Sequence, residues 1–231
     1  MFELTKLIDH AYYHDEFELI IVYAPLGYGK TTYAVKTLAQ LYKDDWEEVK
    51  RKLVFHPKDF VELCDKMIQK GKREKAAVWD DAGLWLFALD QYDPFVKWVI
   101  KYLNVARTNW GALIFTTPTP TWIINKIRRF PQNYTIKIIK ATSDLHRIQR
   151  PRVATAYRSW TAPDFKHTGV RTQFKDSFDA TMPTDFYNYY KPLRDSYTAI
   201  AVAMMRKNLA SVLKNLGDAT ERNTIANEYT I

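Results

Sequence analysis

The residues best placed to do chemistry stand in one short segment, Ala24-Pro-Leu-Gly-Tyr-Gly-Lys-Thr-Thr32. The segment follows a mostly apolar run and ends in residues that can open a helix, so the expected order is strand, tight loop and helix. Backbone N–H groups of such a loop, at the N-terminus of a helix, form a binding site for phosphate. The sequence therefore predicts a phosphate-binding loop and, with it, a bound nucleoside triphosphate; the alternative is a plain glycine turn.

Each residue type in this loop has an expected part in holding a triphosphate. Gly27 and Gly29 let the backbone turn tightly and approach the phosphates without a side chain. Lys30 is expected to reach the β- and γ-phosphates and to act in catalysis, and the Thr31 hydroxyl is expected to hold Mg²⁺. The usual first glycine is replaced by Ala24. The residues expected to contact the nucleotide are Pro25, Leu26, Gly27, Tyr28, Gly29, Lys30, Thr31 and Thr32.

A pair of acids, Asp80 and Asp81, ends the apolar segment Ala76-Ala-Val-Trp79. An apolar strand that delivers carboxylates at its C-terminal end is typical of a Walker B element. Asp80 is predicted to bind Mg²⁺, directly or through water. Asp81 is predicted to orient and deprotonate the attacking water, where many ATPases have glutamate. The alternative is that both acids only cap a strand before Gly83.

Two threonines, Thr116 and Thr117, end a later strand, where a polar side chain can sense the γ-phosphate. We expect Thr117 to act in catalysis, although the β-propensity of threonine also explains both residues. Asn125-Lys126 is not followed by the aspartate of a guanine-reading motif, so ATP is expected rather than GTP. The candidates for an arginine finger that acts on a neighbour's ATP, or else for a surface or DNA-facing arginine, are Arg107, Arg128 and Arg129.

These side chains need a sheet that brings several strand ends together. Apolar runs predict strands at Phe17–Tyr23, Leu53–His56, Ala76–Trp79, Ala112–Thr117 and Tyr134–Lys140. Helices are predicted at Lys30–Tyr42, Asp44–Lys52, Asp59–Lys70, Pro94–Thr108 and Thr121–Arg129. This alternation predicts an α/β fold of the P-loop NTPase type, with a mostly parallel sheet and helices on both faces.

The pattern changes after about residue 145. Arg152–Trp160 and Val170–Phe178 are predicted to pair as an antiparallel hairpin across a loop that contains Pro163 and Gly169. Thr184–Leu216 is predicted to be helical with an interruption at Pro192, before a frayed polar tail. We therefore expect an ATPase core over 1–145, a basic hairpin extension over 146–182, and C-terminal helices and tail over 183–231.

Positive charge is concentrated between Lys126 and Lys175. This window holds twelve lysine and arginine residues against two aspartates, Asp144 and Asp164, in a chain whose net charge is +8. Aromatic residues stand among the cations: Tyr157, Trp160, Phe165 and Phe174. Such interleaving favours a surface that binds DNA through phosphates and stacked bases, with Arg150, Arg152 and Arg158 as contributors. An ordinary basic surface, aromatics that pack a hairpin, or an acidic protein partner are the alternatives.

Other features narrow the class of protein. The single Cys64 excludes a disulfide framework and a cysteine-based zinc site, and His146 and His167 lack ligand-spaced partners, so Mg²⁺ is the only metal expected. No transmembrane run or signal pattern is present, so a cytoplasmic protein without a membrane partner is expected, in the host cytoplasm if it is viral. An apolar stripe at helical spacing predicts core or oligomer packing: Val202, Met205, Leu209, Val212 and Leu216.

The loop, Val78-Trp-Asp-Asp81 and Leu113-Ile-Phe-Thr-Thr-Pro118 together resemble the additional-strand ATPases that act on nucleic acids. Within that group the chain is similar, over roughly residues 17–140, to ATPases of archaeal viruses and plasmids, which resemble the RecA-like HerA/FtsK motors and the Zot-like assembly ATPases. The sequence departs from these groups at Ala24, at Asp81 in place of glutamate, and at Thr117 in place of glutamine.

The resemblance implies ATP hydrolysis coupled to movement of double-stranded DNA, such as genome packaging, by a homo-oligomer that can form a ring. Capsid or replication proteins are possible partners. A DnaA-like initiator, which needs a helical lid after the fifth strand, and a partition-type ATPase are alternatives. Others are a small-metabolite kinase and a nucleotide-gated interaction protein with little turnover.

Overall fold

A computed structural model describes residues 1–131, 133–141, 150–163 and 168–228. The chain divides into two compact units, Met1–Met182 and Pro183–Ile231.

Within the described residues, the first unit is built on a seven-stranded sheet in the order β2-β3-β4-β1-β5-β6-β7. The strands are β1 (Glu18–Tyr23), β2 (Leu53–Val54), β3 (Glu74–Trp79), β4 (Trp110–Thr117), β5 (Tyr134–Lys140), β6 (Pro151–Thr161) and β7 (Thr168–Asp179). The first five strands in this order are parallel, and β6 and β7 are antiparallel. The mostly parallel sheet and the hairpin that continues it are confirmed. Gly169, expected in the hairpin loop, lies inside β7.

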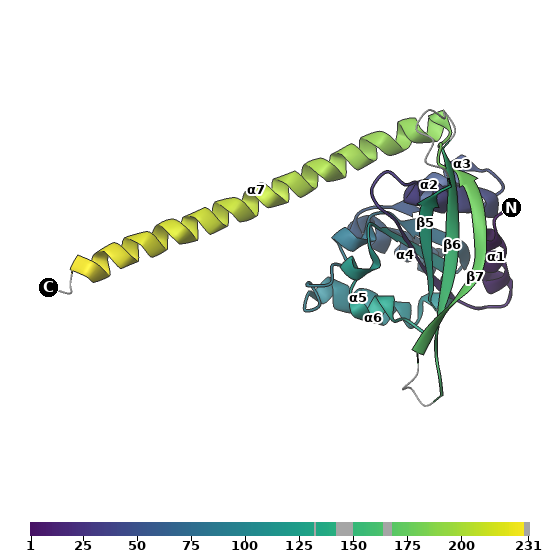
Figure 1. The fold of residues 1–231 in the computed structure, drawn as a ribbon, viewed down its shortest axis with the longest axis horizontal. Helices are drawn as coiled ribbons and strands as arrows, with labels where there is room; N and C mark the ends of the chain where they lie inside the picture. Colours follow the sequence, from purple (N-terminus) through teal and green to yellow (C-terminus); the bar gives the residue numbers. More distant parts are fainter. Residues whose placement is uncertain (132, 142–149, 164–167, 229–231) are drawn as a thin grey trace. The chain divides into compact units, whose positions relative to one another are not determined.

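Helices cover both faces of the sheet. In the first unit they are α1 (Glu3–Tyr13), α2 (Lys30–Leu41), α3 (Trp46–Arg51), α4 (Pro57–Lys70), α5 (Pro94–Leu103) and α6 (Asn125–Arg128), with 3₁₀ turns η1 (Ala82–Leu84), η2 (Ala106–Thr108) and η3 (Pro120–Trp122). Figure 1 shows α1 on one side of the sheet and α4, α5 and α6 on the other. Alternate residues of β1, Leu19 and Ile21, enter a buried core with Trp79 and Phe115 of the neighbouring strands. The central parallel strands β1 and β4 are buried on both faces, as strands of a covered parallel sheet are.

The first helix, α1, was not predicted, and residues distant in the sequence hold both of its ends. At its start, the carboxylate of Asp176 in β7 accepts hydrogen bonds from the N–H groups of Glu3 (2.8 Å) and Leu4 (3.3 Å). The same carboxylate accepts a bond of 2.6 Å from the hydroxyl of Tyr33 in α2. Asp176 thus joins α1, α2 and β7 through one buried carboxylate.

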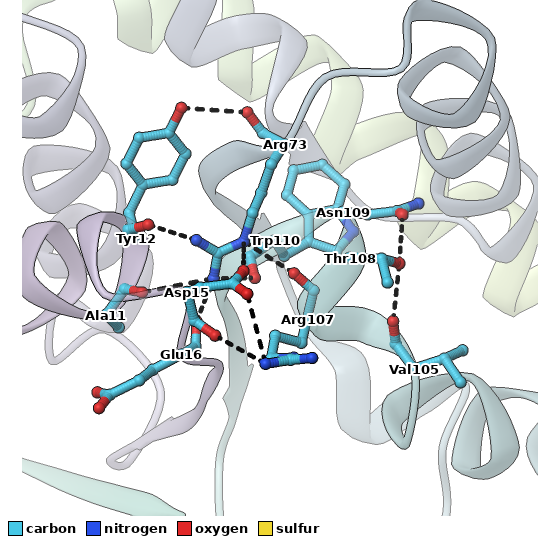
Figure 2. Close-up of polar contacts among 10 residues, drawn as sticks. All are labelled: Ala11, Tyr12, Asp15, Glu16, Arg73, Val105, Arg107, Thr108, Asn109 and Trp110. Atoms are coloured by element: carbon cyan, nitrogen blue, oxygen red, sulfur yellow. Dashed lines mark hydrogen bonds and ion pairs between the residues drawn. The ribbon is translucent and has the colours of Figure 1, made fainter.

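At the other end of α1, the guanidinium of Arg73 binds backbone carbonyls from several segments (Figure 2). It donates to the carbonyls of Tyr12 and Glu16, and to that of Trp110 at 3.2 Å. It also donates to the carbonyl of Arg107 at 2.8 Å. Carbonyls at a helix C-terminus lack partners within the helix, so Arg73 both satisfies them and fixes α1 to the start of β4.

The second unit consists of one helix in the described residues, α7 (Thr184–Glu228), which continues through Pro192. The predicted interruption at Pro192 is wrong. Proline removes a single helical hydrogen bond, and the helix continues because the residues on either side keep theirs. The segment from Asp218 to Glu228, expected to fray, is also helical. Among the described residues, no helix combines the length and apolar character needed to cross a membrane.

Candidate functional site

The loop between β1 and α2 has a backbone that only glycine adopts readily at two positions. Gly27 has a φ of 77° and Gly29 a φ of 90°, both in the left-handed region. A Cβ at Gly29 would also lie 2.9 Å from the Cβ of Ala180, directly after β7. The loop therefore needs glycine at residue 29 both for its conformation and for space.

The N-terminus of α2 opens into this loop together with one lysine. Gly29 is the N-cap and offers no side-chain acceptor to the first N–H groups of the helix. The Lys30 ammonium donates to the carbonyls of Ala24 (3.0 Å) and Pro25 (3.3 Å), and the residue is 6% exposed. A cation beside a helix N-terminus is a physical basis for binding an anion.

Two segments far apart in the sequence meet beside this loop. The Thr31 hydroxyl donates to Oδ1 of Asp80 at 2.8 Å, and Asp80 directly follows β3 and is 1% exposed. A carboxylate and a hydroxyl are oxygen ligands of the kind that Mg²⁺ prefers. The described residues contain no cluster of three or more histidine, cysteine or acidic residues that could hold a metal ion. A divalent cation at Asp80 would therefore need further ligands from water or phosphate.

Asp81 lies beside this pair in a strained backbone conformation. Its φ of 49° and ψ of 37° are left-handed, and its N–H donates to the Thr116 hydroxyl at 2.9 Å. The Thr116 hydroxyl in turn donates to Oδ1 of Asp80 at 2.6 Å. One side chain at the end of β4 thus holds both acids in place.

A mostly apolar cavity of about 570 Å³ adjoins Asp81. It is lined by Leu26, Asp81, Gly83, Leu84, Phe87, Asp90, Pro118 and Trp122. Leu26 comes from the loop and Trp122 from η3, so the cavity connects the loop to the residues that follow β4. It leaves room for a further group next to the Asp81 carboxylate.

The hydroxyl of Thr117, the expected catalytic threonine, bonds to the turn that follows β4. It donates to the Thr119 carbonyl at 3.0 Å, and it lies 2.6 Å from where a Cβ on Gly83 would stand. Thr116, rather than Thr117, contacts Asp80. Side chains alternate along a strand, so only one of two adjacent threonines can face the acids of the neighbouring strand. This alternation is the sequence signal for Thr116, and the role of Thr117 stays a prediction.

The remaining loop residues take several positions. Pro25 and Leu26 are exposed at the tip of the loop. The Tyr28 ring lies 5.0 Å from Nζ of Lys140, at the end of β5. The Thr32 hydroxyl donates to the carbonyl of Ala180 at 3.3 Å and is buried. Thr32 therefore fixes α2 to the end of β7 instead of facing the mouth of the loop.

The three arginines proposed as fingers precede β4 or β5, at the edge of the sheet opposite to Lys30. Nη1 of Arg107 lies 3.4 Å from Oδ2 of Asp15 (Figure 2). Nε of Arg128 donates to the Ile123 carbonyl at 2.8 Å, whereas Arg129 is exposed. None of these arginines lies beside the loop that precedes Lys30 in its own chain, and a role on a neighbour's ATP stays a prediction.

The expected basic surface is not continuous along β6. Arg152 pairs with Lys140 at the loop edge of the sheet, whereas Arg158 pairs with Tyr134 at the opposite edge. Arg152 is 8% exposed, and its Nε has no hydrogen-bond partner within the described structure. The expectation that Arg152 contributes to an exposed surface is therefore wrong. Several residues of the predicted basic window lie outside the described residues, including the two histidines for which no metal site is predicted: Asp144, His146, Asp164, Phe165, Lys166 and His167.

The comparisons with known proteins show one related sequence. The chain matches no protein-family model. It is 30% identical over 131 residues to uncharacterized protein B-251 of Sulfolobus spindle-shape virus 1, with 54% of this chain and 52% of that protein covered. The chain thus spans about half the length of this viral relative.

A solved structure also resembles the chain, at a low level. The N-terminal domain of zonular occludens toxin from Neisseria meningitidis aligns with a TM-score of 0.38 and 16% identity. The alignment covers 74% of this chain and 97% of that domain. The chain is therefore similar in sequence to a viral protein.

Proposed function

We propose that this chain is a P-loop ATPase that binds Mg·ATP between the loop and Asp80, hydrolyses it, and acts on DNA. The observation that carries the proposal is the 2.8 Å bond between Asp80 and Thr31, the residue directly after the buried Lys30. A phosphate cradle and a pair of magnesium ligands thus meet at the end of two parallel strands.

Each group has a part in hydrolysis. Lys30 and the first N–H groups of α2 bind the β- and γ-phosphates, and Thr31 and Asp80 hold Mg²⁺. Bound Mg²⁺ would supply charge neutralisation on the phosphate oxygens. The oxygen of a water molecule attacks the γ-phosphorus, the bond to the β–γ bridging oxygen breaks, and Asp81 accepts the proton of the water. Thr116 keeps Asp81 beside Asp80 while this happens.

Two features support placing the proposed ATPase among the additional-strand ATPases, the group that includes the HerA/FtsK motors. β4 lies between β1 and β3, which is the extra strand of the additional-strand group. The next described elements after β5 are β6 and β7, whereas a DnaA-like initiator would carry a helical lid there. The viral relative and the net charge of +8 agree with a viral protein that moves or packages DNA as a homo-oligomer.

The test is ATP binding and turnover in site variants, with and without DNA. Lys30→Ala should abolish ATP binding in calorimetry, because it removes the cation that faces the β/γ-phosphates. Asp81→Asn should retain Mg·ATP but lose turnover by about 100-fold or more, since an amide cannot accept the proton. Lys66→Ala, an exposed lysine on α4, is the control of equal charge. ATP affinity in Lys30→Ala equal to that of the parent would refute the assignment.

The apolar cavity beside Asp81 favours a second candidate, transfer of the γ-phosphoryl group to a small acceptor. An acceptor hydroxyl in the cavity would lie next to the carboxylate that takes its proton. Release of inorganic phosphate from purified protein and ATP alone separates the two candidates. Steady release that DNA accelerates supports the hydrolase, whereas no release without an added acceptor supports the kinase.

A further inference from the structure

A groove lies at the edge of the sheet opposite to the loop that precedes Lys30. It has a volume of about 550 Å³ and is formed by three segments. They are the residues after α6, the end of β6 and the start of β7: Arg129, Phe130, Pro131, Arg158, Ser159, Trp160, Thr161, Arg171 and Gln173. Arg158 pairs with Tyr134, the first residue of β5, so the groove lies at the N-terminal ends of the parallel strands.

The lining of the groove is cationic. It contributes three guanidinium groups, and none of these lining residues is acidic. Arg129 and Arg171 are exposed, and neither forms an ion pair with another described residue. Oε1 of Glu18 lies 3.9 Å from Nη2 of Arg158, and Glu18 is buried.

An exposed aromatic ring stands among these cations in a fixed position. Trp160 is 42% exposed and lies opposite Gly169 across the hairpin. A Cβ at Gly169 would lie 2.6 Å from three atoms of the indole, so the ring lies over a strand position that only glycine leaves free. The guanidinium carbon of Arg171 is 5.8 Å from the centre of the same ring, within cation–π range.

The two walls of the groove are joined by hydrogen bonds. Ser159 in β6 donates to Oδ1 of Asn133 at 2.7 Å, and Nδ2 of Asn133 donates to the Arg128 carbonyl at 2.6 Å. The end of α6, the segment before β5 and the end of β6 are therefore fixed relative to one another. The groove is a built feature of the fold, not a chance gap between side chains.

We propose that this groove binds a single strand of DNA, with phosphates on Arg129, Arg158 and Arg171 and a base against Trp160. The inference rests on the proposed function in one respect, that the ATPase acts on DNA, and it specifies where and in which form. Arginines that neutralise phosphates combined with an exposed indole are the elements of single-strand binding. A duplex keeps its bases stacked inside, so it could use the arginines but not the ring. An acidic protein segment would likewise leave the ring unused.

The test is binding of a fluorescent oligothymidylate of about 20 nucleotides across a salt series. Trp160→Ala should weaken binding about tenfold, and Trp160→Phe should restore most of it because a stacking ring returns. The double variant Arg129→Ala with Arg171→Ala should lower the slope of log affinity against log salt by about 1.4, roughly 0.7 per phosphate. Gly169→Ala should also weaken binding, because it displaces the indole.

Lys66→Ala is the control, since it removes one exposed cation from α4, outside both the groove and the predicted basic window. It should retain the parent's affinity to within about twofold, and circular dichroism melting checks the fold of every variant. Binding of parent and groove variants with equal affinity, or no binding by the parent, overturns the proposal. Tighter binding of duplex than of single strand overturns it as well, as does equal binding of polyglutamate in the same groove.

ATP binding, measured by calorimetry on the same parent sample, separates this inference from the proposed function. A parent that binds ATP but no oligonucleotide refutes the groove and leaves the ATPase. A parent that binds the oligonucleotide in the groove but no ATP refutes the nucleotide site instead.

Discussion

At the scale of single residues, one hydroxyl group, that of Thr116, contacts both acids of the candidate site. It donates its one proton to Asp80 and accepts the N–H of Asp81, so it fixes both acids. Asp81 is held in a left-handed conformation that a residue with a side chain rarely adopts. Such a conformation persists only where neighbouring groups enforce it, and Thr116 is one such group.

Thr116→Val is therefore expected to lower turnover at least about tenfold while ATP affinity changes less, because valine keeps the shape but loses both hydrogen bonds. Thr116→Ser should restore turnover. Steady-state measurement of kcat and KM checks the split. Thr117→Val in the same assay tests the threonine that the sequence favoured. A normal kcat in Thr116→Val together with a low kcat in Thr117→Val would reverse the two roles.

A second residue, Glu18, links stability to pH. Burial at the start of β1 raises the pKa of Glu18 to about 7, with a smaller opposing effect from Arg158 and a small further increase from Glu16. The folded state therefore keeps a proton that the unfolded chain releases near its ordinary pKa of 4.5. Stability contributed by this group is complete below about pH 4.5 and falls as the pH rises to about 7.

Glu18→Gln should remove this dependence and raise the free energy of unfolding at pH 8 by on the order of 3 kcal/mol relative to the parent. Urea unfolding of both proteins at pH 5 and pH 8 measures the effect. The stability difference between them should grow from the lower to the higher pH. A difference that is equal at both values would show that burial does not control this carboxyl.

At the scale of elements, the buried carboxylate of Asp176 joins three segments. It caps the start of α1 and accepts the Tyr33 hydroxyl of α2, from its own place in β7. The hairpin is therefore bonded to α2, the helix that follows the candidate phosphate-binding loop. Ala180 and Asp179 extend this connection, because their carbonyls accept bonds from Thr32 and Lys36 of α2.

Asp176→Ala should cost about 3 kcal/mol of stability, because it leaves a buried hydroxyl and two helix N–H groups without their acceptor. Tyr33→Phe should cost about 1 kcal/mol, and the double variant should cost less than the two together. Ser177→Ala, exposed on the same strand, is the control. Chemical denaturation of the parent and of the four variants measures these costs. Additive losses would mean that Asp176 and Tyr33 do not act together.

The elements also show what could be predicted from the sequence and why the rest could not. The strands and the loop before Lys30 follow from local patterns, because apolar runs and glycines act over a few residues. α1 carries no side-chain cap of its own, since its acceptor is Asp176, far along the chain. The groove around Trp160 brings together three segments, and no single one contains its pattern. The sequence predicted Arg152 to be exposed. Its burial results from pairing between strands, which the local sequence does not reveal.

At the scale of the whole molecule, the two units differ in how they can fold. Met1–Met182 contains the sheet and both of its covered faces, so it has a core of its own. In Pro183–Ile231, two residues of the predicted apolar stripe, Met205 and Leu209, are exposed and Val202 is partly so. Val212 and Leu216 lie outside the residues whose side chains are described. Core packing within the second unit does not explain Met205 and Leu209, and packing between copies stays a prediction.

A chain of residues 1–182 should therefore fold, with a cooperative thermal transition and ATP binding like that of the full chain. If α7 joins copies of the protein, the shorter chain should have the mass of a monomer in the presence of an ATP analogue, whereas the full chain should be larger. Light scattering after size exclusion measures both. A shorter chain that fails to melt cooperatively would show that the folding of the first unit depends on α7.

The position of Asp176 also has a consequence for the order in which the protein is made. Glu3 leaves the ribosome before the carboxylate that caps its helix, which follows 173 residues later. At ordinary rates of translation this interval is on the order of ten seconds or more. During that time the nascent chain holds α1 and the Tyr33 hydroxyl without their common acceptor. The loop that precedes Lys30 can therefore become fully anchored only after β7 has been synthesised.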